Sequence, residues 1–192
     1  SKSVGAFLNK NPFTKEAPIG IDISNESIVI VELAPAEGRG LELVRLGIAP
    51  TPTNAVRDGE VVNPDLVASQ ISRLLTVHGI KTKRAITAVS GQSAIIRPQV
   101  QFPAIAPKEL KEVIVHDAER YIPFPINDVY IDFQVLNTSK DKHDVLLVAA
   151  QKMLVDSYLE TFEKANLSLI AIDVASFAVM RALSGKDEEI GA

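Results

Sequence analysis

A short polar turn between two apolar runs carries the side chains best suited to chemistry. Asp22 lies in the first run, and Ser24, Asn25 and Ser27 follow it closely. Consecutive backbone N–H groups in a tight turn form a concavity that binds anions, and a nearby Asp can hold a metal ion or its water. Taken alone, the pattern is more simply explained by a β-hairpin with polar turn residues. Both interpretations stay open at this point.

The other titratable residues do not assemble into a catalytic or metal site. The chain has no Cys, which excludes disulfides, thiolate metal sites and thiol catalysis, and its three His are scattered. Asp117 and Glu119 cannot face each other on a helix at a two-residue spacing. His143, between Asp141 and Asp144, belongs to a Lys-containing turn, where solvated side chains are the simpler reading. We therefore predict no catalytic residue and no metal site.

Composition excludes further classes of function. The chain has 192 residues, of which 46% are hydrophobic and 23% charged, as in an ordinary globular protein. A formal net charge of -4 provides no basic field for nucleic acid. The longest apolar runs fall far short of the ~20 residues of a membrane-spanning helix, and the absence of Cys fits a reducing, cytoplasmic compartment. Residues 1–17 are predicted to be a flexible leader rather than a membrane-surface segment.

The elements that must position the polar turn form a mixed α/β pattern. Three predicted strands make a meander, at 19–23, 27–33 and 41–48. A helix follows, with Asn63 as its N-cap and Pro64 at its first position, and Gly79 ends it. The remaining elements of this main unit are a strand at 84–89, a helix at 153–165, a strand at 168–172 and a helix that starts at 173 or 174.

An inserted unit of order β-α-β-β is predicted between 91 and 151. Its elements are a strand at 93–100, a helix from 107, and strands at 129–135 and 145–150. Residues 121–126, Tyr-Ile-Pro-Phe-Pro-Ile, combine apolar side chains with two prolines in a rigid, low-entropy surface. Two interpretations have equal weight: a plug that seals the insert onto the main sheet, and a surface that contacts a partner.

This order of elements is ribonuclease-H-like, with helix-linked strands extending one sheet in parallel. Residues 20–33, 117–136 and 172–183 closely resemble the type IV pilus assembly protein PilM family, actin-like relatives of the cell-division protein FtsA. The resemblance covers nearly the whole chain. It implies an actin-like fold with a leader at 1–17, subdomain 1A at 18–90 and 152–192, and an inserted subdomain 1C at 91–151.

The resemblance implies a phosphate-binding role for Asp22, Ser24, Asn25 and Ser27, because the first hairpin of actin-like ATPases wraps a nucleotide's phosphates. Ser24 stands where the family usually has Gly, and Val29 where it commonly has Lys; a Cβ at the Gly position would crowd a phosphate or strain the backbone. The family's second phosphate hairpin lies in a second half. This chain ends soon after a helix without a final strand, which favours truncation. Half a cleft should neither hydrolyse ATP well nor bind it tightly, so we expect no enzyme activity and no required cofactor, with magnesium and ATP belonging to a full-length form.

The resemblance also implies a partner, because the groove between subdomains 1A and 1C of the PilM family receives the short cytoplasmic tail of the inner-membrane protein PilN. We expect a cytoplasmic adaptor that joins other pilus-machine proteins and meets the inner membrane only through its partner. Candidate groove contacts, chosen for their place near the predicted boundary, are Arg97, Arg120, Tyr121 and Phe124. The alternative is the nucleotide-binding half of an actin-like ATPase. A third reading is a secretion-system protein whose actin-like domain continues into a membrane anchor.

Overall fold

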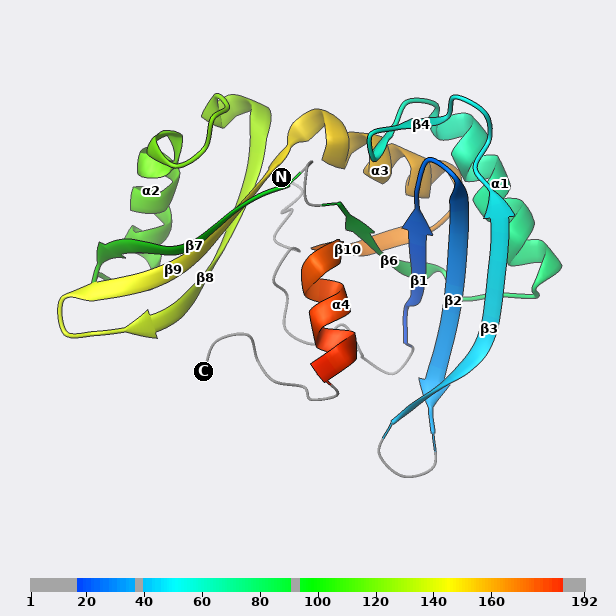
Figure 1. Cartoon of the computed structure of the whole chain (residues 1–192), viewed down its shortest axis with the longest axis horizontal. Coiled ribbons are helices and arrows are strands. Elements are labelled where there is room, and N and C mark those ends of the chain that lie inside the picture. The colour runs from blue at the N-terminus through cyan, green and yellow to red at the C-terminus, as the bar shows by residue number, and fades with distance from the viewer. Residues whose placement is uncertain (1–16, 37–39, 91–93, 185–192) are drawn as a thin grey trace.

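The main unit is a five-stranded mixed sheet with helices on both faces (Figure 1). The computed structural model describes residues 17–36, 40–90 and 94–184. The strands lie in the order β10-β6-β1-β2-β3, antiparallel across β1–β2 and β2–β3 and parallel across β1–β6 and β6–β10. Their bounds are β1 Ile19–Ile23, β2 Ser27–Pro35, β3 Leu41–Pro50, β6 Arg84–Val89 and β10 Ser168–Val174. The predicted meander and its parallel extension are confirmed.

Helices α1 and α3 cover one face of this sheet, and α4 crosses the other face over β6 and β10 (Figure 1). The helices span α1 Pro64–Val77, α3 Lys152–Lys164 and α4 Ala175–Ser184. Alternation along β1 places Ile19, Ile21 and Ile23 in the core and turns Gly20 and Asp22 to the opposite face. The main core therefore lies between the sheet and the pair α1 and α3. Asp22 lies outside that core, on the face that α4 partly covers.

Local signals set the bounds of α1. The Asn63 side-chain oxygen accepts a hydrogen bond from the Leu66 N–H at 3.2 Å, as expected of an N-cap. Pro64 occupies the first helical position, where a missing N–H costs nothing. Gly79 follows the helix with a φ of +63°, a conformation that favours Gly. The predicted helix is confirmed at both ends.

The inserted elements form a separate three-stranded antiparallel sheet, in the order β7-β9-β8, packed against α2 (Figure 1). Their bounds are β7 Ala94–Pro103, α2 Pro107–Asp117, β8 Val129–Thr138 and β9 Lys142–Gln151, with short 3-10 turns at Ala118–Arg120 and Ile126–Asp128. The central strand β9 is buried on both sides. Val145, Leu147 and Ala149 face the core under α2, whereas Leu146 and Val148 join the main core. This double burial explains why β9 is continuously apolar rather than alternating.

A small hairpin in the turn-rich stretch before α1 carries strands β4 Val56–Arg57 and β5 Glu60–Val61. Asp58 and Gly59 form its turn with φ values of 51° and 81°, the backbone of a type I′ hairpin turn. Two-residue strands carry no hydrophobic period, so only the Asp-Gly pair could have predicted this hairpin. Its turn reaches the cleft that contains Asp22.

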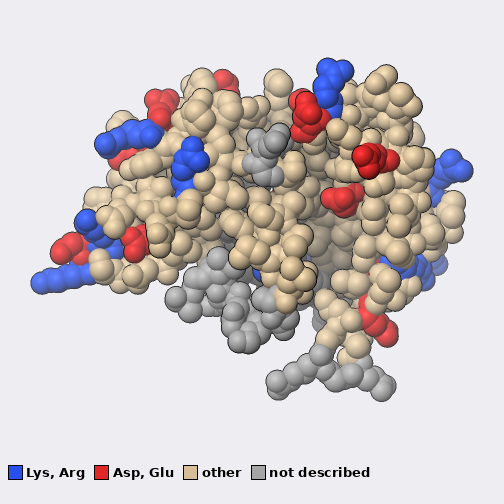
Figure 2. All heavy atoms as spheres, in the orientation of Figure 1, with Lys and Arg blue, Asp and Glu red and all other residues tan. Residues whose placement is uncertain are grey.

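Two features of the described residues concern the binding of membranes and of nucleic acid. Within the described ranges, no helix combines the length and the apolar character needed to cross a membrane. On the face drawn in Figure 2, acidic and basic side chains are interspersed and no large basic patch gathers. A nucleic-acid backbone would therefore find no continuous positive surface on this face.

Candidate functional sites

The first hairpin turn opens into a cleft of about 410 Å³. The cleft lies where the parallel strands β1, β6 and β10 end, the usual place for a ligand in an open α/β sheet. Its polar lining comprises Asp22, Ser24, Asn25, Glu26, Asp58, Gly59, Ser90 and Tyr158. The fold thus brings three of the four predicted phosphate-site residues to one cleft. Ser27 does not line it and instead closes the turn by hydrogen bonds to Ser24.

The Ser24 hydroxyl satisfies the turn from within. It donates to the Ser27 carbonyl at 3.0 Å and accepts from the Ser27 and Glu26 N–H groups at 3.0 and 3.3 Å. The Ser24 N–H also donates to the Ser27 carbonyl, at 3.0 Å. The N–H groups that would cradle a phosphate are therefore occupied at three positions of this turn. Ser24 is absent from the positive-φ residues of the described chain, so the strain expected from replacing a Gly does not arise.

The electrostatics of this cleft oppose a bare phosphate. Asp22, Glu26 and Asp58 are all in its lining, whereas none of the described residues that line it is Lys or Arg. Asp22 is exposed as a whole residue, but partial burial of its carboxyl in the cleft raises the pKa above its usual value. An anion entering this cleft would need a cation to offset the carboxylates.

Tyr158 is a cleft residue that sequence reasoning missed. It reaches the cleft from α3 with 1% of its surface exposed, and its hydroxyl donates to the Gly59 carbonyl at 2.9 Å. Burial first, and then the nearby Asp22 carboxylate, raise the pKa of the Tyr158 hydroxyl. The hydroxyl is therefore a neutral donor that holds the β4–β5 turn beside Asp22. A single Tyr in an amphipathic helix gives no sequence signal for such a contact 99 residues away.

The predicted partner-groove residues lie at the insert, and the structure gives several of them internal contacts. The Arg97 Nε donates to the Tyr121 carbonyl at 2.9 Å, which ties β7 to the Tyr-Ile-Pro-Phe-Pro segment. The rings of Tyr121 and Phe102 meet edge to face with centroids 6.0 Å apart. Tyr121 and Phe124 pack on the insert's own core, so the prediction of a plug onto the main sheet is wrong about its destination. Arg120 is exposed.

A second hollow, of about 530 Å³, lies between α3 and the segment that joins β5 to α1. We call it the α3 groove; its lining is Glu60, Val61, Val62, Pro64, Met153, Asp156, Ser157 and Glu160. Val62 and Met153 are 45% and 68% exposed, so the groove has apolar side chains among its carboxylates. None of the predicted partner-groove residues lines it.

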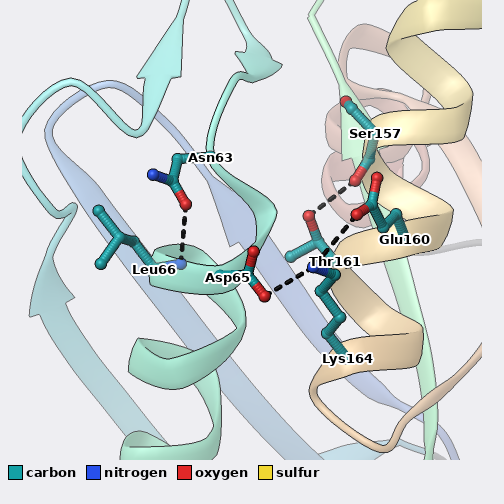
Figure 3. Close-up of polar contacts among 7 residues, drawn as sticks. All are labelled: Asn63, Asp65, Leu66, Ser157, Glu160, Thr161 and Lys164. Atoms are coloured by element: carbon teal, nitrogen blue, oxygen red, sulfur yellow. Dashed lines mark hydrogen bonds and ion pairs between the residues drawn. The ribbon is translucent and has the colours of Figure 1, made fainter.

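One end of the α3 groove is tied together by Lys164, which joins α3 to the start of α1 (Figure 3). Its Nζ lies 2.6 Å from an Asp65 oxygen and 3.2 Å from a Glu160 oxygen. These two hydrogen bonds raise the pKa of the Lys164 ammonium. Lys164 therefore offsets one groove carboxylate directly.

The other end of the α3 groove meets the insert. The Tyr130 hydroxyl, from β8, donates to Asp156 at 2.9 Å, and this hydrogen bond is the main reason that the pKa of Tyr130 is raised. The Lys152 ammonium lies 5.6 Å from the centroid of the Tyr130 ring. The groove is thus continuous with the edge where the inserted unit joins α3.

The fold and the family of this chain follow from comparison with known proteins. The mixed sheet with its three-stranded insert is an actin-like α/β fold. The chain belongs to the type IV pilus assembly protein PilM family, whose sequence model matches residues 20–190.

Two solved structures place the fold in context. The chain is 31% identical to one in the "PilM-PilN type IV pilus biogenesis complex", with a TM-score of 0.78 over 88% of this chain and 50% of that one. It is 14% identical to the cytoplasmic domain of EpsL, an inner membrane component of the type II secretion system of Vibrio cholerae, with a TM-score of 0.54 over 81% of this chain and 56% of that one. The second likeness shows the fold alone. This chain spans about half the length of both matched chains.

Proposed function

We propose that this chain is the part of a PilM-type adaptor that docks the cytoplasmic tail of PilN. The observation that carries the proposal is its 31% identity, over 88% of its length, to a chain of the PilM–PilN complex. In this proposal the protein works in the cytoplasm and is held at the inner membrane face by its partner. It couples other pilus-machine proteins to that membrane.

The proposed seat of the tail is the edge where α3 meets the insert. Met153 and Val62 supply exposed apolar side chains in a groove of about 530 Å³, and Arg120 is exposed on the insert. An extended peptide gains affinity from such apolar contacts and orientation from charged groups beside them. Tyr121 and Phe124 pack on the insert's own core, so in this proposal they hold the insert together rather than line the groove.

A fluorescence-anisotropy titration with a labelled PilN-tail peptide tests the docking, with a scrambled peptide as control. We expect saturable, sequence-dependent binding. Met153→Asp should weaken it at least about tenfold, equivalent to ~1.4 kcal/mol. Val77→Asp is the matched control, because Val77 is 70% exposed, close to the 68% of Met153, and lies at the end of α1. Absence of binding up to about 1 mM, or equal losses in both variants, would contradict the proposal.

We also propose that this chain does not turn over ATP. The proposal is supported by the internally satisfied Ser24 turn and by the three carboxylates of the cleft. Transfer of a phosphoryl group needs cations and donors preorganised around it. The alternative, a nucleotide-binding half of an actin-like ATPase, is favoured by the position of the cleft at the ends of three parallel strands.

Two assays separate these readings. Phosphate release and the shift of the unfolding temperature are measured with magnesium and ATP, on this chain and on its Asp22→Ala variant. We expect no release above the buffer rate and no shift in either protein. A shift that Asp22→Ala abolishes would support the nucleotide-binding reading. Release that requires Asp22 would make the chain an enzyme.

A further inference from the structure

The free edge of the main sheet has an unusual apolar row. β3 lies at the end of the sheet and pairs only with β2 among the described strands. In this pairing Arg45 is opposite Glu32 and Leu43 is opposite Leu33, so Val44 is an extra residue, a β-bulge. The bulge resets the alternation of β3. Leu43 and Leu46 therefore fall on the same face of the sheet.

Four large apolar side chains share that face. They are opposite alternate β2 residues, whose side chains point to one side, away from the buried Ile28 and Ile30. Their exposed fractions are Leu41 52%, Leu43 58%, Leu46 45% and Ile48 61%. Proteins usually protect an edge strand with charged residues, prolines or bulges that turn it away. Here the bulge has the opposite effect, because it brings the apolar side chains into one row.

Another edge strand of the molecule shows the usual protection. β7, at one edge of the inserted sheet, contains Pro98 and a bulge at which Gln99 has a φ of 59°. In β3, by contrast, Pro50 stands only at the very end. Among the described strands only β2 pairs with β3, so within the described part of the chain the backbone between Leu41 and Ala49 is open to pairing with another strand.

The β3 sequence is complementary to itself. A two-fold axis between Val44 and Arg45 sets Leu41 opposite Ile48 of a second copy and Leu43 opposite Leu46 of that copy, each pair occurring twice. Because both copies carry the same bulge, every apolar pair falls on one face. We propose that β3 pairs antiparallel with β3 of a second copy of this chain, which joins the two main sheets into one.

The charges of the strand agree with this register. Glu42 and Arg45 lie on the face opposite the apolar row, because their β2 partners Ala34 and Glu32 alternate with Leu33. In this register Glu42 lies opposite Gly47 of the second copy. It is diagonal to Arg45 of that copy, and the long Arg45 side chain is within reach of the Glu42 carboxylate. Arg45 already pairs with Glu32, so it would lie between two carboxylates. No like charges come directly opposite each other.

The pairing is expected to be weak. A single strand pair buries less than the ~800 Å² per partner of a typical stable interface. Sedimentation velocity at about 10–500 µM should show a reversible, concentration-dependent shift from monomer to dimer. Leu46→Lys should abolish that shift while unfolding remains cooperative, whereas the control Val77→Lys, on α1, should keep it. A wild-type protein that is monomeric at every concentration, or dimerisation unaffected by Leu46→Lys, would overturn the proposal.

The register has its own test, which uses the absence of Cys from the chain. Leu43→Cys and Leu46→Cys are prepared as separate proteins and oxidised alone and as a mixture. Opposite residues on antiparallel strands have Cβ atoms about 4.5–5.5 Å apart, near enough for a disulfide with small adjustment. We expect the mixture to give several-fold more cross-linked dimer than either variant alone. Equal yields in all three samples would refute this register.

Discussion

Replacing Ser24 tests how the first turn is stabilised. The Ser24 hydroxyl takes part in three hydrogen bonds, one to the Ser27 carbonyl and two from the Ser27 and Glu26 N–H groups. Ser24→Ala removes all three and keeps a Cβ. Ser24→Gly removes them and also adds backbone freedom to the unfolded chain. The Ser24 N–H bond to the Ser27 carbonyl does not involve the side chain and remains in both variants.

The size of the expected loss in stability follows from how accessible the turn is to water. A hydrogen bond contributes about 0.5–1.5 kcal/mol net to the free energy of unfolding. Where the groups are accessible, hydrogen bonds to water offset part of its loss. Ser24 and Ser27 are half-buried and Glu26 is exposed, so Ser24→Ala should cost about 1 kcal/mol in all. Ser24→Gly should cost about 0.5–1 kcal/mol more. For a chain of this size about 1 kcal/mol lowers the unfolding temperature by about 2–4 °C.

Circular dichroism during thermal unfolding measures the effect. Asn25→Ala is the control, because Asn25 is exposed in the same turn, and its unfolding temperature should match the wild type. Both Ser24 variants release the N–H groups of Glu26 and Ser27, so any shift with magnesium and ATP should be larger than in the wild type. A Ser24→Gly protein as stable as the wild type would refute the claim that the hydroxyl holds the turn.

Three further substitutions test other contacts. Asn63→Ala should lower the free energy of unfolding in urea by about 1 kcal/mol, because the Leu66 N–H loses its cap. Tyr158→Phe should cost about 1–1.5 kcal/mol in the same assay, because the Gly59 carbonyl loses its buried donor. Asp22→Asn should raise the unfolding temperature at pH 7. Partial burial raises the folded-state pKa of Asp22 above the unfolded value of 3.8, so the folded protein loses some stability as the pH rises from 3.8 through the folded-state pKa. Because Asp22 is exposed as a whole residue, the gain from Asn should be small, and below pH 3.8 it should disappear.

Each of these has an outcome that contradicts it. Tyr130→Phe removes an exposed hydrogen bond to Asp156, so it should lower the free energy of unfolding less than Tyr158→Phe does. Equal losses in the two variants would show that burial of the hydrogen bond does not set its contribution to stability. An Asn63→Ala change below about 0.3 kcal/mol would mean that Pro64 alone starts α1. The Asp22 reasoning fails if Asp22→Asn has the same effect at pH 3 and pH 7.

Much of the secondary structure was predictable because its signals are local. β1 and β6 have the predicted bounds, and α1 begins and ends as its Asn63 cap and Gly79 indicated. β2 and β3 continue two residues beyond the prediction, because the two strands pair with each other along their full lengths. Strand ends depend on partners, which a single segment does not contain.

The candidate sites were only partly predictable. The polar turn at Ser24 is visible in the sequence, but the direction of its hydroxyl is decided by the hairpin that closes it. The α3 groove joins residues of the β5–α1 segment to residues of α3 about ninety positions later, and no local pattern marks such a pair. The Tyr-Ile-Pro-Phe-Pro segment was recognisable as apolar and rigid. Its packing on the insert's own core depended on where α2 and β7 lie.

The sequence by itself determined the order of elements, the mixed α/β class, the turn chemistry and the family. Each of these rests on composition, hydrophobic periodicity or a motif within a few tens of residues. Only the tertiary structure decided which residues share a face or a cleft. The Val44 bulge places Leu43 and Leu46 on one face, and the hydroxyl of Tyr158 reaches Gly59 across 99 positions. Such contacts arise when strands pair and helices pack, and their partners are too distant in the chain for any local pattern to encode.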